Sequence, residues 1–232
     1  MFHRLTYFHL GCKVLWLSLL VGNFAAAQVP SDAKTSGGGD LSNAAVVSFV
    51  FNERQALDVL ISGTTRLERL CAVPLKPPVE KPTVQALTDL RGQVQDRALR
   101  LGASAERSVS LTQFAMTSAQ QGSQQACSPL NRMRALVGAA PAELPSCEAA
   151  KKRLEGVTTL NKAAKEWLHI HEERQRLFGQ LIKLESAGCT RTGFAQRMVQ
   201  THEQSFSAFE DQALNLFESA LRKEAPTPVS KP

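Results

Sequence analysis

Histidines are the residues of this chain that could bind a metal ion or act as a general base. Only His169, His171 and His202 lie beyond the first 27 residues. The stretch from His171 begins like an H-E-x-x-H zinc-protease helix, in which two histidines one turn apart bind the metal. The second histidine would fall at Gln175, and His169 cannot replace it because residues two apart on a helix point roughly 200° apart. The spacing therefore excludes a zinc-protease site.

A metal or haem site between His171 and His202 is the remaining possibility for these side chains. Both lie near apolar stripes of long helical segments. Counted outward from a turn near Thr190, the two would sit about 12 Å apart along the helix axis. We therefore expect structural histidines, with His171 level with Glu210, and we predict no metal and no cofactor. A metal- or haem-binding bundle is kept as an alternative.

Other catalytic and ligand-binding patterns are missing or broken. Residues 102–106 (GASAE) do not form the G-x-S-x-G turn of a serine hydrolase, and neither glycine-rich nucleotide motif occurs. The basic cluster at 151–153 stands beside Glu148 and Glu155 without an aromatic residue, which is typical of a solvated helix face. We therefore expect no enzymatic activity and no nucleic-acid partner.

The first 27 residues have the composition of a secretory signal peptide. His3, Arg4 and Lys13 precede an apolar run, and the segment ends in Ala25-Ala26-Ala27 without any acidic residue. A basic start, a short apolar stretch and small residues at the cleavage site are what export requires. The run is too short to span a membrane. We predict cleavage after Ala27, a periplasmic or secreted protein, and no integral membrane segment afterwards.

Three- and four-residue spacing of apolar side chains dominates the rest of the chain, and no segment alternates with a period of two. Residues 28–40 are expected to be a flexible leader, 41–224 a helical bundle domain and 225–232 a disordered proline-rich tail. Thr83, Ser128 and Ser146 are predicted to begin helices, and Thr190 or Thr192 to begin the last one. Short connections predict an all-α, up-and-down bundle of four long helices plus one short helix.

The four cysteines left after signal cleavage predict two disulfides. In an up-and-down bundle, the first long helix delivers Cys71 to the end of the bundle that the third long helix reaches at Cys189. The second long helix delivers Cys127 to the opposite end, where Cys147 begins the third. A disulfide needs Cα atoms within about 7 Å. The topology therefore predicts Cys71–Cys189 and Cys127–Cys147.

An apolar face on the first helix is the candidate for a partner-binding patch. Residues 44–51 (AAVVSFVF) are apolar around most of the helix, so one side would stay exposed in a bundle. In architecture, though in no motif, such a bundle resembles the helical minor-pilus subunits of conjugative and type IV secretion systems. We expect a non-enzymatic binding protein of a cell-envelope or secretion system, or alternatively a periplasmic inhibitor or immunity protein against a toxic enzyme. The predicted patch comprises Val46, Val47, Phe49, Val50 and Phe51.

Overall fold

The computed structural model describes residues 40–71, 83–138, 145–190 and 193–225, apart from the side chains of 40–42, 135 and 202–211. These residues form five helices and no strand. The expected all-α bundle of four long helices and one short helix is confirmed. The helices are α1 (Asp40–Cys71), α2 (Val84–Ala126), α3 (Pro129–Leu136), α4 (Cys147–Ser186) and α5 (Phe194–Glu224).

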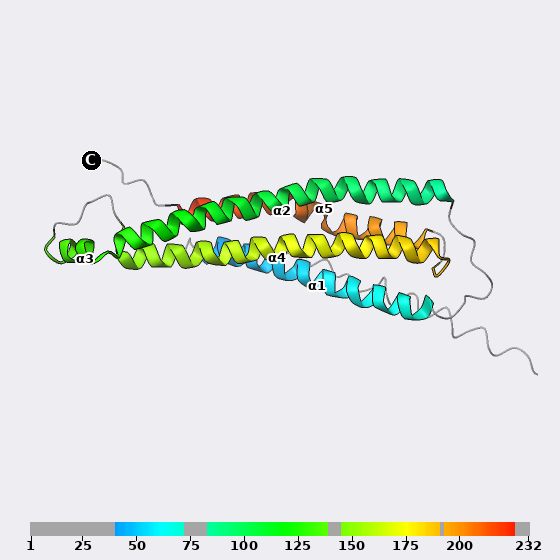
Figure 1. Cartoon of the computed structure of the whole chain (residues 1–232), viewed down its shortest axis with the longest axis horizontal. Coiled ribbons are helices and arrows are strands. Elements are labelled where there is room, and N and C mark those ends of the chain that lie inside the picture. Colours follow the sequence, from blue (N-terminus) through cyan, green and yellow to red (C-terminus); the bar gives the residue numbers. More distant parts are fainter. Residues whose placement is uncertain (1–39, 72–82, 139–144, 191–192, 226–232) are drawn as a thin grey trace, which may run out of the picture. The chain divides into compact units, whose positions relative to one another are not determined.

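Helix α4 is the centre of the bundle. It packs against α1, α2 and α5, and α1 and α5 also pack against each other. Figure 1 shows α2 and α4 side by side along their whole lengths, with α1 and α5 covering only part of that pair. Because three helices surround α4, its buried residues extend over a wider arc than one stripe.

An aromatic cluster joins three helices in the core. The indole of Trp167 on α4 stacks on Phe217 of α5, with ring centroids 5.8 Å apart. Phe49 of α1 meets the same indole edge to face, also at 5.8 Å. Contacts of this kind add to the stabilisation from apolar burial. This cluster fixes how α1 and α5 lie on α4.

Both expected disulfides are present. Cys71 and Cys189 are bonded with Cα atoms 4.9 Å apart, and Cys127 and Cys147 with Cα atoms 4.7 Å apart. The first bond ties the end of α1 to the segment after α4. The second joins the end of α2 to the start of α4, around α3. The antiparallel topology that predicted these pairs is therefore confirmed.

Three helix starts follow from local sequence. Thr83 Oγ1 accepts a hydrogen bond from the Ala86 amide at 3.2 Å, and Ser146 Oγ accepts one from the Ala149 amide at 3.1 Å. Ser128 Oγ accepts one from the Asn131 amide, and Ser128 directly precedes Pro129, the first residue of α3. Each hydroxyl satisfies one of the amides that a helix start leaves without an intrahelical acceptor.

The start of α5 differs from the prediction. Neither Thr190 nor Thr192 begins this helix; Gly193 precedes it, with φ at 77° in the left-handed region that glycine readily adopts. Glu185 of α4 replaces the missing side-chain cap, since its two carboxylate oxygens accept hydrogen bonds of 2.6 Å from the amides of Gly193 and Ala195. A buried carboxylate ten residues away thus caps the helix.

The buried face of α2 also departs from the apolar pattern. Leu90, Leu101 and Ala105 are buried, but Val84 and Phe114 point to solvent. Beyond Ala105 the buried stripe continues through small and polar residues. The hydroxyls of Ser108 and Thr112 can be buried because they bond to backbone carbonyls one turn back. This part of the stripe comprises Ser108, Thr112, Ala119, Ser123 and Ala126.

Three sequence predictions concern other parts of the chain. The predicted signal peptide, residues 1–27, lies outside the described residues, as does nearly all of the predicted leader 28–40 and of the predicted tail 225–232. Within the described ranges, no helix is both long enough and apolar enough to cross a bilayer.

Candidate functional site

The histidine-rich stretch of α4 forms packing contacts. His171 is buried, and its Nε2 lies 3.1 Å from the carbonyl oxygen of Ala98 on α2. The ring packs beside Gly102, where a Cβ would lie 3.5 Å from Nε2, an ordinary van der Waals contact. On the outer side of α4, a hydrogen bond from Arg176 lowers the pKa of Glu173.

The metal site considered between His171 and His202 is only partly described. The His202 and Glu210 side chains lie outside the described residues. Among the side chains that are described, no group of three His, Cys, Asp or Glu residues could hold a metal ion.

The sequence reasoning missed a buried ion pair between α1 and α4. Arg174 donates a hydrogen bond to the carboxylate of Glu53, and each side chain is only 2% exposed. Both residues lie on their helix's apolar stripe: Glu53 three residues after Val50 and four before Leu57, and Arg174 three after His171. The sequence did contain a signal for this ion pair, because each of the two helices has a charged residue at a position of its apolar stripe. The pair is enclosed by the core and joins α1 to α4 at one level of the bundle.

A polar contact joins α2 and α4 further along. Asn161 Nδ2 donates to Thr112 Oγ1 at 3.1 Å, and that hydroxyl lies 2.8 Å from the Ser108 carbonyl. Asn161, Thr112 and Ser108 are all buried. The contact fixes the antiparallel register of the two helices, in agreement with the His171–Ala98 contact and the Cys127–Cys147 bond.

The predicted binding patch on α1 is not a single surface. Val46, Phe49 and Val50 are buried in the core, so the prediction was wrong for these three. Only Val47 and Phe51, 44% and 59% exposed, remain accessible, one turn apart on the outer face. The reason is that α1 packs against both α4 and α5, which cover a wider arc than one neighbouring helix would.

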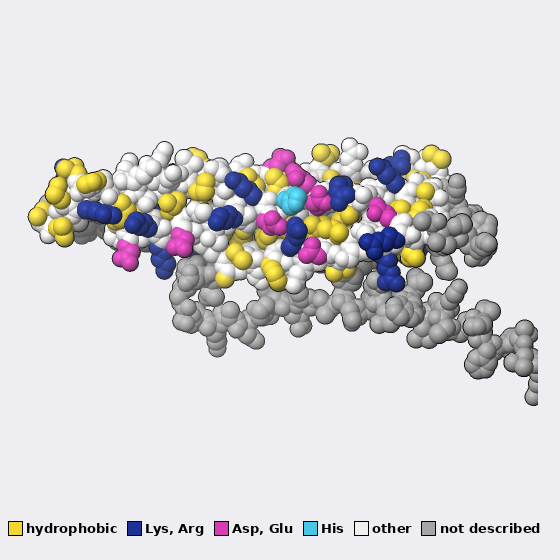
Figure 2. All heavy atoms as spheres, turned by 60° about the horizontal axis from the view of Figure 1, so that its bottom comes forward, with side chains coloured by type: hydrophobic (Ala, Val, Ile, Leu, Met, Phe, Trp, Pro, Cys, Tyr) yellow, Lys and Arg dark blue, Asp and Glu magenta, His cyan; other side chains and the backbone are white. Residues whose placement is uncertain are grey.

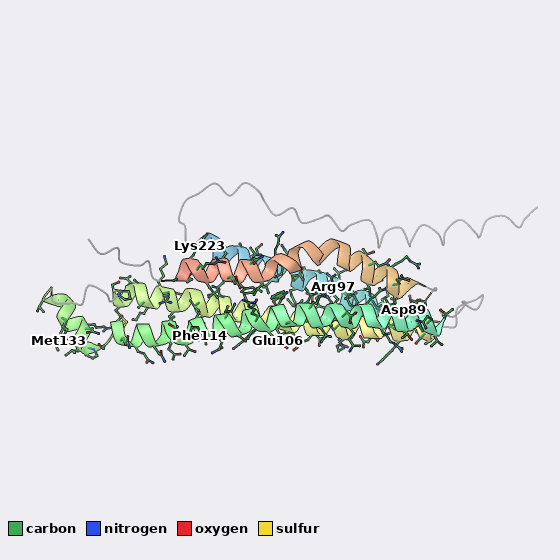
Figure 3. The ribbon with its side chains drawn as sticks, turned by 90° about the horizontal axis from the view of Figure 1, so that it is seen from above. Asp89, Arg97, Glu106, Phe114, Met133 and Lys223 are labelled. Atoms are coloured by element: carbon green, nitrogen blue, oxygen red, sulfur yellow. A yellow bond between two sulfur atoms is a disulfide. The ribbon has the colours of Figure 1, made fainter. Side chains whose placement is uncertain are left out.

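A stronger surface feature lies on α2. Residues 108–131 contain no Asp, Glu, Lys or Arg, whereas the first half of α2 carries exposed Asp89, Asp96 and Glu106. Phe114, within this uncharged stretch of α2, is 78% exposed (Figure 3). We call this the uncharged face. The exposed residues around Phe114 are Ser110, Thr117, Ser118, Gln121, Gln124 and Gln125.

One end of the α2–α4 pair extends beyond α1 and α5. Asn43 near the start of α1 donates to Glu224 at the end of α5 at 2.7 Å, and this carboxylate lies over Gly156 of α4. The register of α2 on α4 places Gly156 level with about residue 117. We call residues 118–138 and 145–155 the tip and the remainder of the bundle the body. Figure 1 shows α2 and α4 continuing past both other helices to α3.

Helix α3 turns its apolar side chains to solvent at the end of the tip. Four are exposed by 55% to 86%, whereas every fully buried tip residue is alanine or serine. Asn131 holds α3 to α2 through a 2.8 Å bond to the Gln125 carbonyl. Figure 2 shows a hydrophobic cluster at this end of the molecule with basic side chains next to it. The four apolar residues are Leu130, Met133, Leu136 and Val137.

Comparison of the chain with protein-family models, with curated proteins and with solved structures finds no significant match. The surfaces of α2 and α3 therefore carry the functional proposals below.

Proposed function

We propose that the protein is an exported, non-enzymatic helical binding protein, and that it serves as an accessory or assembly component of a cell-envelope or secretion system. Export is supported by the signal-like composition of residues 1–27 and by the two disulfides. Disulfides persist in oxidising compartments and are rare in the cytosol. The protein accordingly acts in the periplasm or outside the cell.

The observation that carries the binding role is the uncharged face with the exposed ring of Phe114 on it. Charged residues are depleted and aromatic residues enriched at the centres of protein interfaces, because burying an unpaired charge is costly and an aromatic ring buries a large apolar area. Twenty-four consecutive residues without a charge, 108–131, stand in a chain in which 21% of residues are charged. Val47 and Phe51 on α1 offer a second, smaller contact.

Site-specific photo-crosslinking in the native cell tests this role. A photoreactive phenylalanine analogue at Phe114 should give one discrete crosslinked product. The same analogue at Leu99 should give none, since Leu99 is 67% exposed on the same helix but lies among Asp96, Arg97 and Arg100. An envelope or secretion protein in the product supports the proposal, and a toxic enzyme supports the inhibitor alternative. Equal crosslinking at both positions contradicts a specific face.

Export has a separate test. Sequencing the N-terminus of the protein recovered from outside the cytosol should give Gln28 as the first residue. Recovery of a chain that retains Met1 would contradict export by signal cleavage.

A further inference from the structure

We propose that the end of the tip, formed by α3, is a membrane-contact site that inserts its apolar side chains into a bilayer surface containing anionic phospholipid. This site lies beyond Phe114 and the exposed α2 residues around it. The proposal rests on three observations: the exposure of the apolar face, the order of apolar and basic residues at the tip, and the way α3 is held.

The apolar face of α3 is unusually exposed for a folded helix. Met133, Leu136 and Val137 are 63%, 86% and 77% exposed, and Leu130 is 55% exposed. Leu130 and Met133 lie three residues apart on one face of α3, and Val137 follows directly after the helix. Contiguous exposed apolar surface marks a contact with a protein or a membrane. All four side chains are aliphatic or thioether, without an aromatic ring.

The basic charge of the tip indicates what kind of surface contacts its apolar side chains. The described tip residues carry five basic side chains against Glu148 and Glu155, and α3 itself has no acidic residue. A second copy of the chain would bring two basic surfaces together, which repel. An anionic leaflet instead places a layer of negative headgroups over an apolar layer. The basic residues are Arg132, Arg134, Lys151, Lys152 and Arg153.

The arrangement of these groups matches that layering. The hydrophobic cluster occupies the end of the molecule and basic side chains lie next to it, on the side of the bundle (Figure 2). When the apolar side chains enter the acyl boundary, long basic side chains behind them reach the headgroups. A convex apolar end of this kind fits a bilayer surface.

Helix α3 is also preformed. The Cys127–Cys147 bond closes the segment that contains it, and Asn131 holds it to the Gln125 carbonyl. The guanidinium of Arg132 lies 3.7 Å from Cys147 Sγ, so it is oriented toward the disulfide at the base of α3. A free amphipathic peptide loses conformational entropy when it folds on a membrane. This helix is already folded, so eight residues suffice for a contact.

Vesicle flotation of the oxidised, exported protein tests the site. The protein should float with vesicles of phosphatidylcholine and phosphatidylglycerol in equal parts and should not float with phosphatidylcholine alone. Replacing Leu136→Ser and Val137→Ser together should weaken partitioning at least about tenfold, because less apolar surface leaves water. The matched control, Val84→Ser with Leu99→Ser, removes two equally exposed apolar side chains from α2 and should leave partitioning unchanged.

The basic residues have their own pair of variants. Lys151→Gln with Lys152→Gln should weaken partitioning roughly fivefold for each charge removed. Arg91→Gln with Arg100→Gln removes the same charge from the body and should have a much smaller effect. Circular dichroism and intact disulfides establish that each variant is folded.

Three results would overturn the membrane site: no flotation with anionic vesicles, equal flotation with both vesicle types, or equal losses in the tip and control variants. An absence of flotation with anionic vesicles would indicate that the apolar end of the tip instead binds an acidic groove on a protein. Because the vesicles contain no protein, these results are independent of the crosslinking at Phe114.

Discussion

The body and the tip share α2 and α4, yet the two regions are stabilised differently. In the body, α1 and α5 cover the pair, and large side chains such as Trp167 and Phe217 fill the core around the Glu53–Arg174 ion pair. In the tip, α2 and α4 pack against each other without α1 and α5, and the buried side chains are alanine and serine. Small side chains bury little apolar area, so the tip depends on its disulfide and its helix caps.

The two regions also differ at the surface. Where α1 and α5 cover the pair, α2 carries exposed charges as far as Arg107. Where they end, the same helices need no large apolar residue inside, and the apolar residues of α3 stay on the surface. The tip therefore combines a core of small side chains with the most exposed apolar side chain of the described residues, Leu136 at 86%.

The largest expected effect comes from removing the body disulfide. Replacing Cys71→Ser and Cys189→Ser opens a loop of 118 residues. By loop entropy this should lower the free energy of unfolding by about 5 kcal/mol. Urea denaturation followed by Trp167 fluorescence measures the loss. If this loss is no larger than the loss caused by removing the tip disulfide, the two regions are not stabilised differently, and the comparison is wrong.

The buried ion pair should have the next largest effect. Arg174→Met removes the cation next to the Glu53 carboxylate in the core, and breaking a buried pair in this way costs about 3–5 kcal/mol. Adding Glu53→Leu should recover most of that loss, because the charge that needed compensation is then gone as well. Denaturation of the single and double variants measures the coupling. Purely additive losses would show that the two side chains do not act as a pair.

Removing the tip disulfide should destabilise the tip and leave the body unchanged. Cys127 and Cys147 are 20 residues apart, so replacing both by serine should destabilise the tip by about 3 kcal/mol. Because the tip has almost no apolar core, the effect should appear as faster amide exchange in residues 118–126 and 147–155. Exchange of the amides around Trp167 should be unchanged. A uniform increase across the whole chain would mean that tip and body unfold as one unit.

The smallest effects concern the two kinds of helix cap. Glu185→Ala removes the acceptor for two amides at the start of α5 and should cost about 1–2 kcal/mol, measured as global stability. Ser146→Ala removes one local acceptor and should cost about 1 kcal/mol, measured as opening of the tip. Glu185→Gln keeps one acceptor oxygen and should fall between Glu185→Ala and the unmodified protein. Equal effects of the alanine and glutamine variants would argue against the capping role.

Sequence reasoning succeeded where a local rule or the chain direction was sufficient. Hydroxyl residues at Thr83 and Ser146 begin helices because the amides they satisfy are three residues away. Prolines and periodic apolar positions marked the long helices, and their alternating directions selected the cysteine pairs from three possibilities. It failed for the α1 patch, because local apolar content does not say how many helices will cover a face.

The helical class, the up-and-down order and the two disulfides therefore follow from residue spacing and chain direction alone. Packing in three dimensions brings Glu53 to Arg174, lets Glu185 cap α5, and leaves Phe114 and the apolar side of α3 facing water. Each of these depends on the register between helices and on where α1 and α5 end against Gly156. Register is set by side chains more than a hundred residues apart in contact, such as Asn43 with Glu224, and no local pattern specifies it.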